Sequence, residues 1–174
     1  MSFIEAIKTC FAKYVTFSGR ARRSEHWYFF LFITLVEIVL IIWSASTIMG
    51  PMMEYIAEGG DPNDKEAITE IVNPYRFSPS TIVLLIFSVG TLLPIIAVQI
   101  RRMHDTGRSG WWSMTYWGGV LLMYAPFISP MISYPVFLIG TIWFIYLACQ
   151  DSTPGTNIYG PNPKGLEETT STNF

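Results

Sequence analysis

Charged residues are scarce in this sequence. Asp, Glu, Lys and Arg account for only 14% of its 174 residues, whereas hydrophobic residues account for 51% and the mean hydropathy is positive. The charges are also unevenly spread, so that long stretches have almost none. Because a helix needs roughly 20 apolar residues to cross a bilayer, this pattern excludes an ordinary soluble domain and indicates a membrane protein.

Four apolar stretches meet or approach the length of a membrane span. They lack the regular apolar and polar alternation that is typical of membrane-spanning strands, and backbone groups in lipid must be hydrogen-bonded within their own segment. We therefore predict an all-α, polytopic membrane protein with one membrane domain, residues 1–165, and four transmembrane helices. The predicted spans are residues 27–49, 80–100, 111–128 and 131–149. The last two are short and meet at a proline-rich junction, so a tight hairpin and a re-entrant pair both fit.

Positive charge is nearly absent from one side of the predicted bundle. The link between the first two spans, residues 50–79, has only Lys65 and Arg76 against six acidic residues. The other nine of the eleven basic residues precede the first span, lie between the second and third spans, or lie in the tail. Since Lys and Arg gather on the cytoplasmic side, we expect residues 50–79 to be an outer loop and both termini to be cytoplasmic.

Cysteine is also scarce, with only Cys10 and Cys149. Both fall on the predicted cytoplasmic side, where disulfides are rare, so reduced thiols are expected. These cysteines and the two histidines lie at one predicted level, but none has the ligand spacing of a zinc site, and we expect no metal or cofactor.

The first apolar run has no clear small-residue cleavage site, which favours a retained anchor over a cleaved signal peptide.

The segments outside the spans also carry patterns. Residues 2–17 place apolar side chains on one helical stripe and polar ones on the other face, which predicts an amphipathic helix in the membrane interface. Ser24 is a candidate cap for the first span, and residues 64–72 are a candidate short helix in the outer loop. Residues 150–165 are rich in turn formers and predict a cytoplasmic loop tail. Residues 166–174 are expected to be disordered.

Three long motifs resemble one known family. They are "KYVTFSGRARRSEHWYFFLF" (13–32), "RRMHDTGRSGWW" (101–112) and "DSTPGTNIYGPNPKG" (151–165). Together they resemble the bacterial YhaH-like inner-membrane proteins, catalogued as domain of unknown function 805, in the family's order and over nearly the whole chain. The resemblance implies a multi-helix protein of the bacterial inner membrane and no established activity. Where the family has a basic residue before Tyr-Gly, this chain has Ile158, which argues against anion binding by the tail itself.

Arginine is concentrated near one predicted membrane plane. Its planar guanidinium group matches phosphate oxygens in a bidentate manner, so we predict a surface that binds anionic lipid headgroups or an acidic partner. The arginines of this predicted surface are Arg20, Arg22, Arg23, Arg101, Arg102 and Arg108. The positive-inside rule alone would also account for these charges, without any particular geometry.

The link between the second and third spans contains residues that the positive-inside rule does not explain, because that rule requires only positive charge. Gly107 and Gly110 permit tight turns and positive φ, while Asp105 could orient His104 or pin an arginine. Both a shaped binding site and a compact, internally hydrogen-bonded turn explain these residues. Adjacent residues rarely act as a base and its orienting group, and no Ser or Cys nucleophile motif is nearby. An enzyme acting on a phosphorylated lipid is therefore only the third hypothesis.

Glu37 is the one charge inside the first span, about 15 Å from its start. It is either a proton or ion site in a small transporter or a protonated acid that joins helices through hydrogen bonds. We predict a non-enzymatic binding protein, with transport at Glu37 as the competing function. Its expected partners are the bilayer and its anionic lipids, but not nucleic acid. A second copy of the chain or another membrane protein could also be a partner. The small residues Gly118, Gly119 and Gly140 could allow close contacts between helices.

Overall fold

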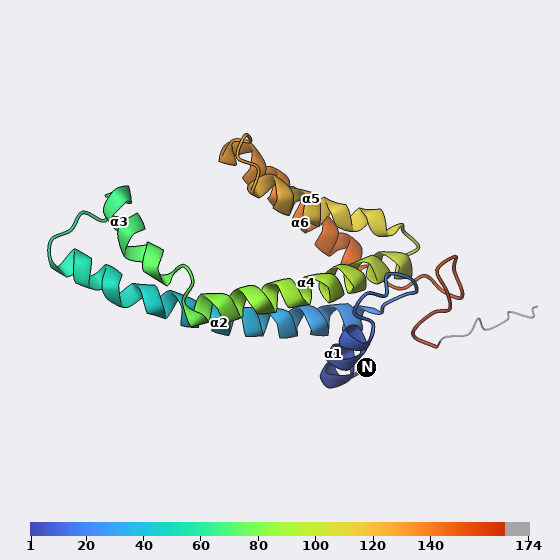
Figure 1. Cartoon of the computed structure of the whole chain (residues 1–174). Coiled ribbons are helices and arrows are strands. Elements are labelled where there is room, and N and C mark those ends of the chain that lie inside the picture. Colours follow the sequence, from blue (N-terminus) through green and yellow to red (C-terminus); the bar gives the residue numbers. More distant parts are fainter. Residues whose placement is uncertain (166–174) are drawn as a thin grey trace, which may run out of the picture. The chain divides into compact units, whose positions relative to one another are not determined.

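The computed structural model describes residues 1–165 and contains only helices, turns and loops in that range, apart from one isolated bridge between Asn157 and Gly160. The prediction of an all-α protein is confirmed, while the predicted disordered segment 166–174 lies outside the described residues. The helices in chain order (Figure 1) are α1 (Phe3–Ala12), α2 (Arg23–Ala57), α3 (Lys65–Val72), the 3₁₀ helix η1 (Asn73–Tyr75), α4 (Pro79–Asp105), the 3₁₀ helix η2 (Gly110–Ser113), α5 (Met114–Met123) and α6 (Pro130–Cys149).

Three of these helices, α2, α4 and α6, are long and apolar enough to cross a membrane. With 35 and 27 residues, α2 and α4 extend beyond the predicted spans 27–49 and 80–100. The 20 residues of α6 agree closely with the predicted span 131–149. Many large apolar side chains on these helices are exposed, as expected for surfaces that face lipid instead of water.

The predicted third span, residues 111–128, differs most from the prediction. It consists of η2 and the 10-residue helix α5, which ends at Met123. A 10-residue α-helix rises about 15 Å, half of a bilayer core. The prediction of one continuous helix over residues 111–128 is therefore wrong, because α5 ends at Met123. The chain beyond it turns toward Pro126 and Pro130, and proline disfavours helical backbone in the residue before it.

The helix ends differ from the predicted ones at several positions. Ser2 and Glu5 form a reciprocal capping box at the start of α1, but this helix stops at Ala12, short of the predicted residue 17. The predicted cap Ser24 is instead inside α2, which begins at Arg23. The short helix predicted at residues 64–72 is confirmed as α3, where the Asp64 carboxylate accepts from the backbone amides of Glu66 and Ala67.

The described chain divides into two compact units, one of residues 31–92 and one of residues 1–30 together with the chain from Leu93 onward. In the unit of residues 31–92, the Ser44 and Thr81 hydroxyl groups are 3.0 Å apart and form a hydrogen bond between α2 and α4. Such hydrogen bonds are a usual means of joining helices in a membrane.

In the other unit, α5 and α6 lie side by side (Figure 1). Their contact depends on glycine, because a Cβ atom at Gly119 would lie 2.8 Å from Phe137 Cα and one at Gly140 would overlap the Thr115 carbonyl oxygen. Nothing lies within 4 Å of the corresponding position at Gly118. Close packing at small residues is thus confirmed for Gly119 and Gly140 and not for Gly118, and it occurs within the chain.

Candidate functional site

Asp105, the last residue of α4, is the centre of a buried ion-pair cluster. Its Oδ1 accepts from Arg20 Nε at 2.9 Å, and its Oδ2 accepts from Arg102 and from Ser152 Oγ, the latter at 2.6 Å. The Arg20, Arg102 and Asp105 side chains are at most 1% exposed. A buried charge needs a partner to be tolerated, and here one carboxylate serves two guanidinium groups. We call Arg20, Arg102, Asp105 and Ser152 the clasp.

Arg20 ties the clasp to the tail, residues 150–165. Its two Nη groups donate to three carbonyl oxygens of the tail, at 2.7 Å for Thr153, 2.8 Å for Gly155 and 3.2 Å for Gly160. The loop before α2 and the tail are therefore held together through one side chain. The tail has little regular structure, so these bonds to its backbone replace those that a helix or sheet would supply.

Arg102 ties the end of α4 to the end of α6. Its Nε donates to the Ala148 carbonyl at 2.9 Å, one Nη donates to the Ala21 carbonyl at 3.3 Å and the other donates to the Gln150 carbonyl. The last carbonyl groups of a helix have no partner inside it and carry partial negative charge. Arg102 thus forms a hydrogen bond with a free carbonyl group at the end of α6 and also neutralises the Asp105 carboxylate.

A second buried ion pair joins Arg101 to Glu25, with 2.9 Å between Nη2 and Oε1. The other Nη of Arg101 donates to the carbonyls of Lys13 and Thr16, at 3.2 and 2.6 Å. Glu25 was not among the predicted site residues, although it is the only acid between Glu5 and Glu37. That isolation inside a basic segment is a sequence signal for a buried partner of arginine.

His104 and Asp105 are adjacent in sequence but serve different partners. The His104 Nδ1 lies 3.1 Å from the Gly19 carbonyl oxygen, and its ring stacks on Tyr159 with 3.8 Å between centroids. Because a carbonyl only accepts, a neutral His104 ring carries its proton on Nδ1. Two roles were predicted for Asp105. The ion pair with an arginine is confirmed, with both Arg20 and Arg102. Orientation of the His104 ring by the Asp105 carboxylate is not.

The two motif glycines have different roles. Gly107 has a φ of 75° at the turn that follows α4, so positive φ is confirmed there. Gly110 has no positive φ, but a Cβ atom there would lie 2.6 Å from the Ile100 side chain. The predicted link between the second and third spans, residues 101–112, also needs correction, since Arg101 to Asp105 still belong to α4 and the turn begins only at Thr106.

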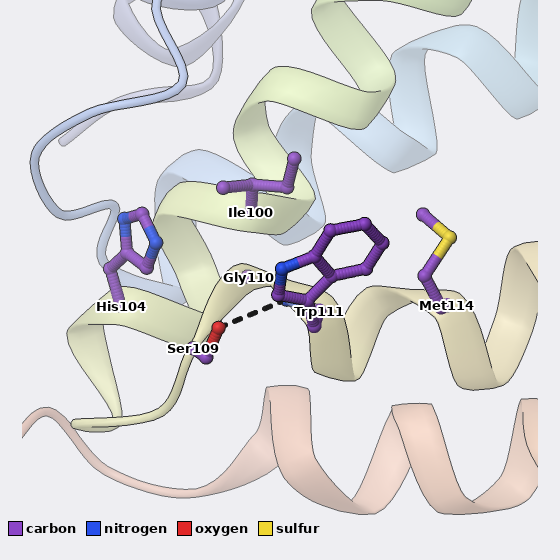
Figure 2. Close-up of a pocket in the computed structure, with 6 residues that line it drawn as sticks. All are labelled: Ile100, His104, Ser109, Gly110, Trp111 and Met114. Carbon is purple, nitrogen blue, oxygen red and sulfur yellow. Dashed lines mark hydrogen bonds between the residues drawn. The ribbon is translucent and has the colours of Figure 1, made fainter.

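Beside this turn the surface has a pocket of about 330 Å³ (Figure 2). Figure 2 shows the Trp111 indole between Ile100 and Met114, with Ser109 Oγ accepting from the Trp111 amide. The residues that line the pocket are Ile100, His104, Ser109, Gly110, Trp111 and Met114. Trp111 is 79% exposed, which suits a ring that sits at the boundary between lipid and water.

The other three predicted arginines lie nearer the surface. Arg23 is exposed and donates to the Gln150 carbonyl at 2.9 Å. Arg22 and Arg108 are half-buried, and Arg108 donates to the Thr106 carbonyl at 3.4 Å. The six arginines that the sequence grouped together therefore fall into a buried set, Arg20, Arg101 and Arg102, and a more accessible set.

Cys10 and Cys149 carry no disulfide, and only Cys149 is exposed. Burial, followed by the nearby Glu25 carboxylate, raises the pKa of the Cys10 thiol to about 12. Cys10 is therefore a protonated thiol and not a reactive one. Within residues 1–165, no three His, Cys, Asp or Glu side chains come together in a way that could hold a metal ion.

Glu37, the candidate transport residue, is half-buried in α2 and accepts from Ser88 Oγ of α4 at 3.4 Å. Both residues belong to the unit of residues 31–92. The hydrogen bond agrees with the interpretation of Glu37 as a polar link between helices. A proton or ion pathway at Glu37 stays a prediction.

Comparison with known proteins gives relatives over most of the chain. A family model described as "Protein of unknown function (DUF805)" matches residues 14–161. The inner membrane protein YhaH of Escherichia coli strain K12 is 33% identical over 151 residues, which cover 87% of this chain and 89% of YhaH. The inner membrane protein YhaI of the same strain is 30% identical over 153 residues, which cover 87% of this chain and 88% of YhaI. No solved structure matches at a significant level.

Proposed function

Because this chain belongs to the DUF805 family and is similar to the inner membrane proteins YhaH and YhaI, we propose that it is a non-enzymatic inner-membrane protein whose cytoplasmic face binds anionic lipid headgroups. The observation that carries the proposal is the division of its arginines. Arg20, Arg101 and Arg102 neutralise buried acids and hold the chain segments together. Arg22, Arg23 and Arg108 remain at or near the surface.

Four membrane crossings are supported by the hydrogen bond from Arg102 to Ala148, which joins the end of α4 to the end of α6. The 20-residue helix α6 rises about 30 Å, the thickness of a bilayer core. If α6 crosses, then residues 106–129 must cross in the opposite direction to reach its start. The 3₁₀ helix η2, α5 and the irregular stretch after Met123 would make this crossing together.

The cytoplasmic position of both termini is supported by the same contacts. Arg20 precedes α2, Asp105 ends α4, and Thr153 follows α6, and these three residues are hydrogen-bonded to one another. They therefore share one side of the membrane. Nine of the eleven basic residues lie in the segments that this side would contain, and the cytoplasmic side is where such an excess is found.

An interfacial position for α1 is supported by its exposed side chains. Ile4 is 63% exposed and Phe11 is 38% exposed, and Lys8 is exposed on the same short helix. An apolar surface of this kind is stabilised in the acyl chain boundary while lysine reaches the headgroups. Ala6 and Cys10, in contrast, are buried, so α1 is anchored to the protein on one side and free to contact lipid on another.

Lipid binding is tested with two charge-matched double variants, R22Q/R23Q and K65Q/R76Q. Each basic residue near anionic lipid contributes about 1 kcal/mol, so R22Q/R23Q should weaken phosphatidylglycerol binding by about 2 kcal/mol, roughly 30-fold. The measurement is a titration of phosphatidylglycerol into the detergent-solubilised protein, followed by native mass spectrometry. Added salt should weaken binding to the unchanged protein, because Arg23 is exposed and Arg22 is half-buried, so that ions can screen both charges.

K65Q/R76Q is the control because it removes the same charge from the outer loop, where Lys65 and Arg76 are both exposed. Its affinity for phosphatidylglycerol should equal that of the unchanged protein. Equal affinities for R22Q/R23Q and the unchanged protein would contradict the proposed function. An equal loss of affinity in both double variants would also contradict it, because the loss would then depend only on the net charge of the protein and not on the position of the arginines.

A further inference from the structure

A second cavity lies near the start of α2 and shares no lining residue with the surface pocket at Trp111. Its volume is about 240 Å³, and it is lined by side chains of α2, α4, α5 and α6 that all belong to one compact unit. His26 and Trp27 come from α2, Gln99 comes from α4, and Thr141 and Phe144 come from α6. Among the described residues, no Lys, Arg, Asp or Glu lines this cavity.

Two polar side chains at the cavity lack hydrogen-bond partners. His26 is 1% exposed, and neither of its ring nitrogens has a partner among residues 1–165. The buried Thr141 hydroxyl also has none in that range. Buried polar atoms are nearly always paired in folded proteins, and each exception requires an explanation. Both exceptions line one cavity, so a molecule bound there could supply the missing partners.

The His26 ring is expected to be neutral. It has no carboxylate partner among the described residues, and burial disfavours the charged form of histidine. It also lies in the first turn of α2, where the partial positive charge of the helix disfavours a second cation. A neutral imidazole offers one donor and one acceptor, and the Thr141 hydroxyl can offer either.

Gln99 adds a third polar group, 3% exposed. Its Oε1 accepts from Trp117 Nε1 at 2.6 Å, and because an indole N–H can only donate, this bond fixes the amide orientation. The group that remains for a further hydrogen bond is the amide NH₂. The polar lining is therefore rich in donors, which suits a ligand that carries carbonyl or hydroxyl oxygens.

The remaining walls are mainly aromatic. The His26 ring lies edge-on to Trp27, with 5.0 Å between centroids, and to Phe144, with 5.9 Å between centroids. Aromatic walls favour a flat ring as ligand. The absence of charge in the described lining disfavours an anion, and the start of α2 disfavours a cation. The cavity is also smaller than the 300 Å³ or so at which sites for drug-sized ligands begin, so it suits one ring and not a whole lipid.

We propose that this cavity binds the headgroup of a membrane quinone. One quinone carbonyl oxygen accepts a hydrogen bond from His26 and the other from Thr141, the ring packs against Trp27 and Phe144, and the isoprenoid tail extends into the lipid. No chemical step is part of the proposal. It is also independent of headgroup binding by Arg22 and Arg23, which the R22Q/R23Q variant tests separately.

The test is a titration of the full chain in nanodiscs with a short-tailed benzoquinone, followed by quenching of tryptophan fluorescence, since Trp27 lines the cavity. Thr141→Val keeps the side-chain shape and removes the unpaired hydroxyl. We expect about fivefold weaker quinone binding, as for one hydrogen bond, with a Tm equal to or above that of the unchanged protein. A role in folding alone would lower the Tm and leave quinone affinity unchanged.

Thr47→Val is the matched control, because Thr47 Oγ1 donates to the Ser44 carbonyl in the other compact unit. Its quinone affinity should be unchanged, whereas His26→Phe should weaken binding at least tenfold. Three results would overturn the proposal: no saturable quenching by the quinone, equal affinities for Thr141→Val and the unchanged protein, or equal competition by an alcohol with the same tail and no ring.

Discussion

Replacing Asp105 with asparagine is expected to lower the free energy of unfolding by about 3–5 kcal/mol, the usual cost of breaking a buried ion pair. The reason is specific to the clasp, where Arg20 and Arg102 share the one carboxylate. Asparagine removes the negative charge and leaves two buried cations facing each other. Thermal unfolding of the purified protein in detergent, followed by circular dichroism, measures this loss.

Asp151→Asn is the control for this prediction. Asp151 is 62% exposed and forms an ion pair with Lys164 on the surface of the tail, and the Lys164 ammonium group lowers the pKa of the Asp151 carboxylate. Exposed pairs of this kind contribute little to stability. Its Tm should be close to that of the unchanged protein. If Asp105→Asn unfolded at the same temperature as Asp151→Asn, the clasp would not be what holds these segments together.

Gly140→Ala is expected to give the second large loss of stability, because even one methyl group at this position of α6 would overlap the Thr115 carbonyl oxygen of α5. The obstacle is backbone, which cannot rotate away as a side chain can. Overpacking of this kind costs about 1–3 kcal/mol, and here it would separate α5 from α6. Thermal unfolding in detergent measures the effect.

Gly118→Ala is the matched control in the same pair of helices. Nothing lies within 4 Å of the added methyl group, and alanine is a better helix former than glycine by about 1 kcal/mol. Gly118→Ala should therefore leave the Tm unchanged or raise it. The packing of α5 on α6 would be misassigned if both alanine variants changed the Tm by the same amount.

The sequence predicted the helices well where their signals are local. The long, almost uncharged apolar runs predicted α2, α4 and α6, and the short helix predicted at residues 64–72 is α3. It failed at residues 111–128 because a run of apolar residues predicts burial in lipid without specifying regular helix throughout. The close packing at Gly140 could be suspected from residue size, but its partner Thr115 has no sequence signature.

The sequence also identified the motif residues but not their burial. Arg101 and Arg108 look alike in sequence, since both satisfy the positive-inside rule. They differ in structure because Arg101 reaches Glu25 and backbone carbonyls of distant segments. Carbonyl groups exist at every position, so their role as arginine partners cannot be read from residue type. The acids inside basic segments, Glu25 and Asp105, are the signal that could have identified the buried pairs.

The burial of half of the predicted arginines changes the expected effect of mutations. Substitution of Arg101 or Arg102 would remove partners of Glu25 or Asp105 and destabilise the fold, so loss of lipid binding in such variants would not identify a binding residue. Substitution of Arg22 and Arg23 leaves the two buried ion pairs intact. Lipid binding is therefore tested at those two positions.

The proposed topology places the clasp on the cytoplasmic side of a chain that crosses the membrane four times. Single cysteines, introduced at Asn63 and at Ser109 after replacement of Cys10 and Cys149, test it directly, because both sites are exposed. With a membrane-impermeant maleimide applied from the periplasmic side, Asn63→Cys should be labelled in unbroken cells and Ser109→Cys only after the membrane is opened. Labelling of Ser109→Cys in unbroken cells would contradict the claim.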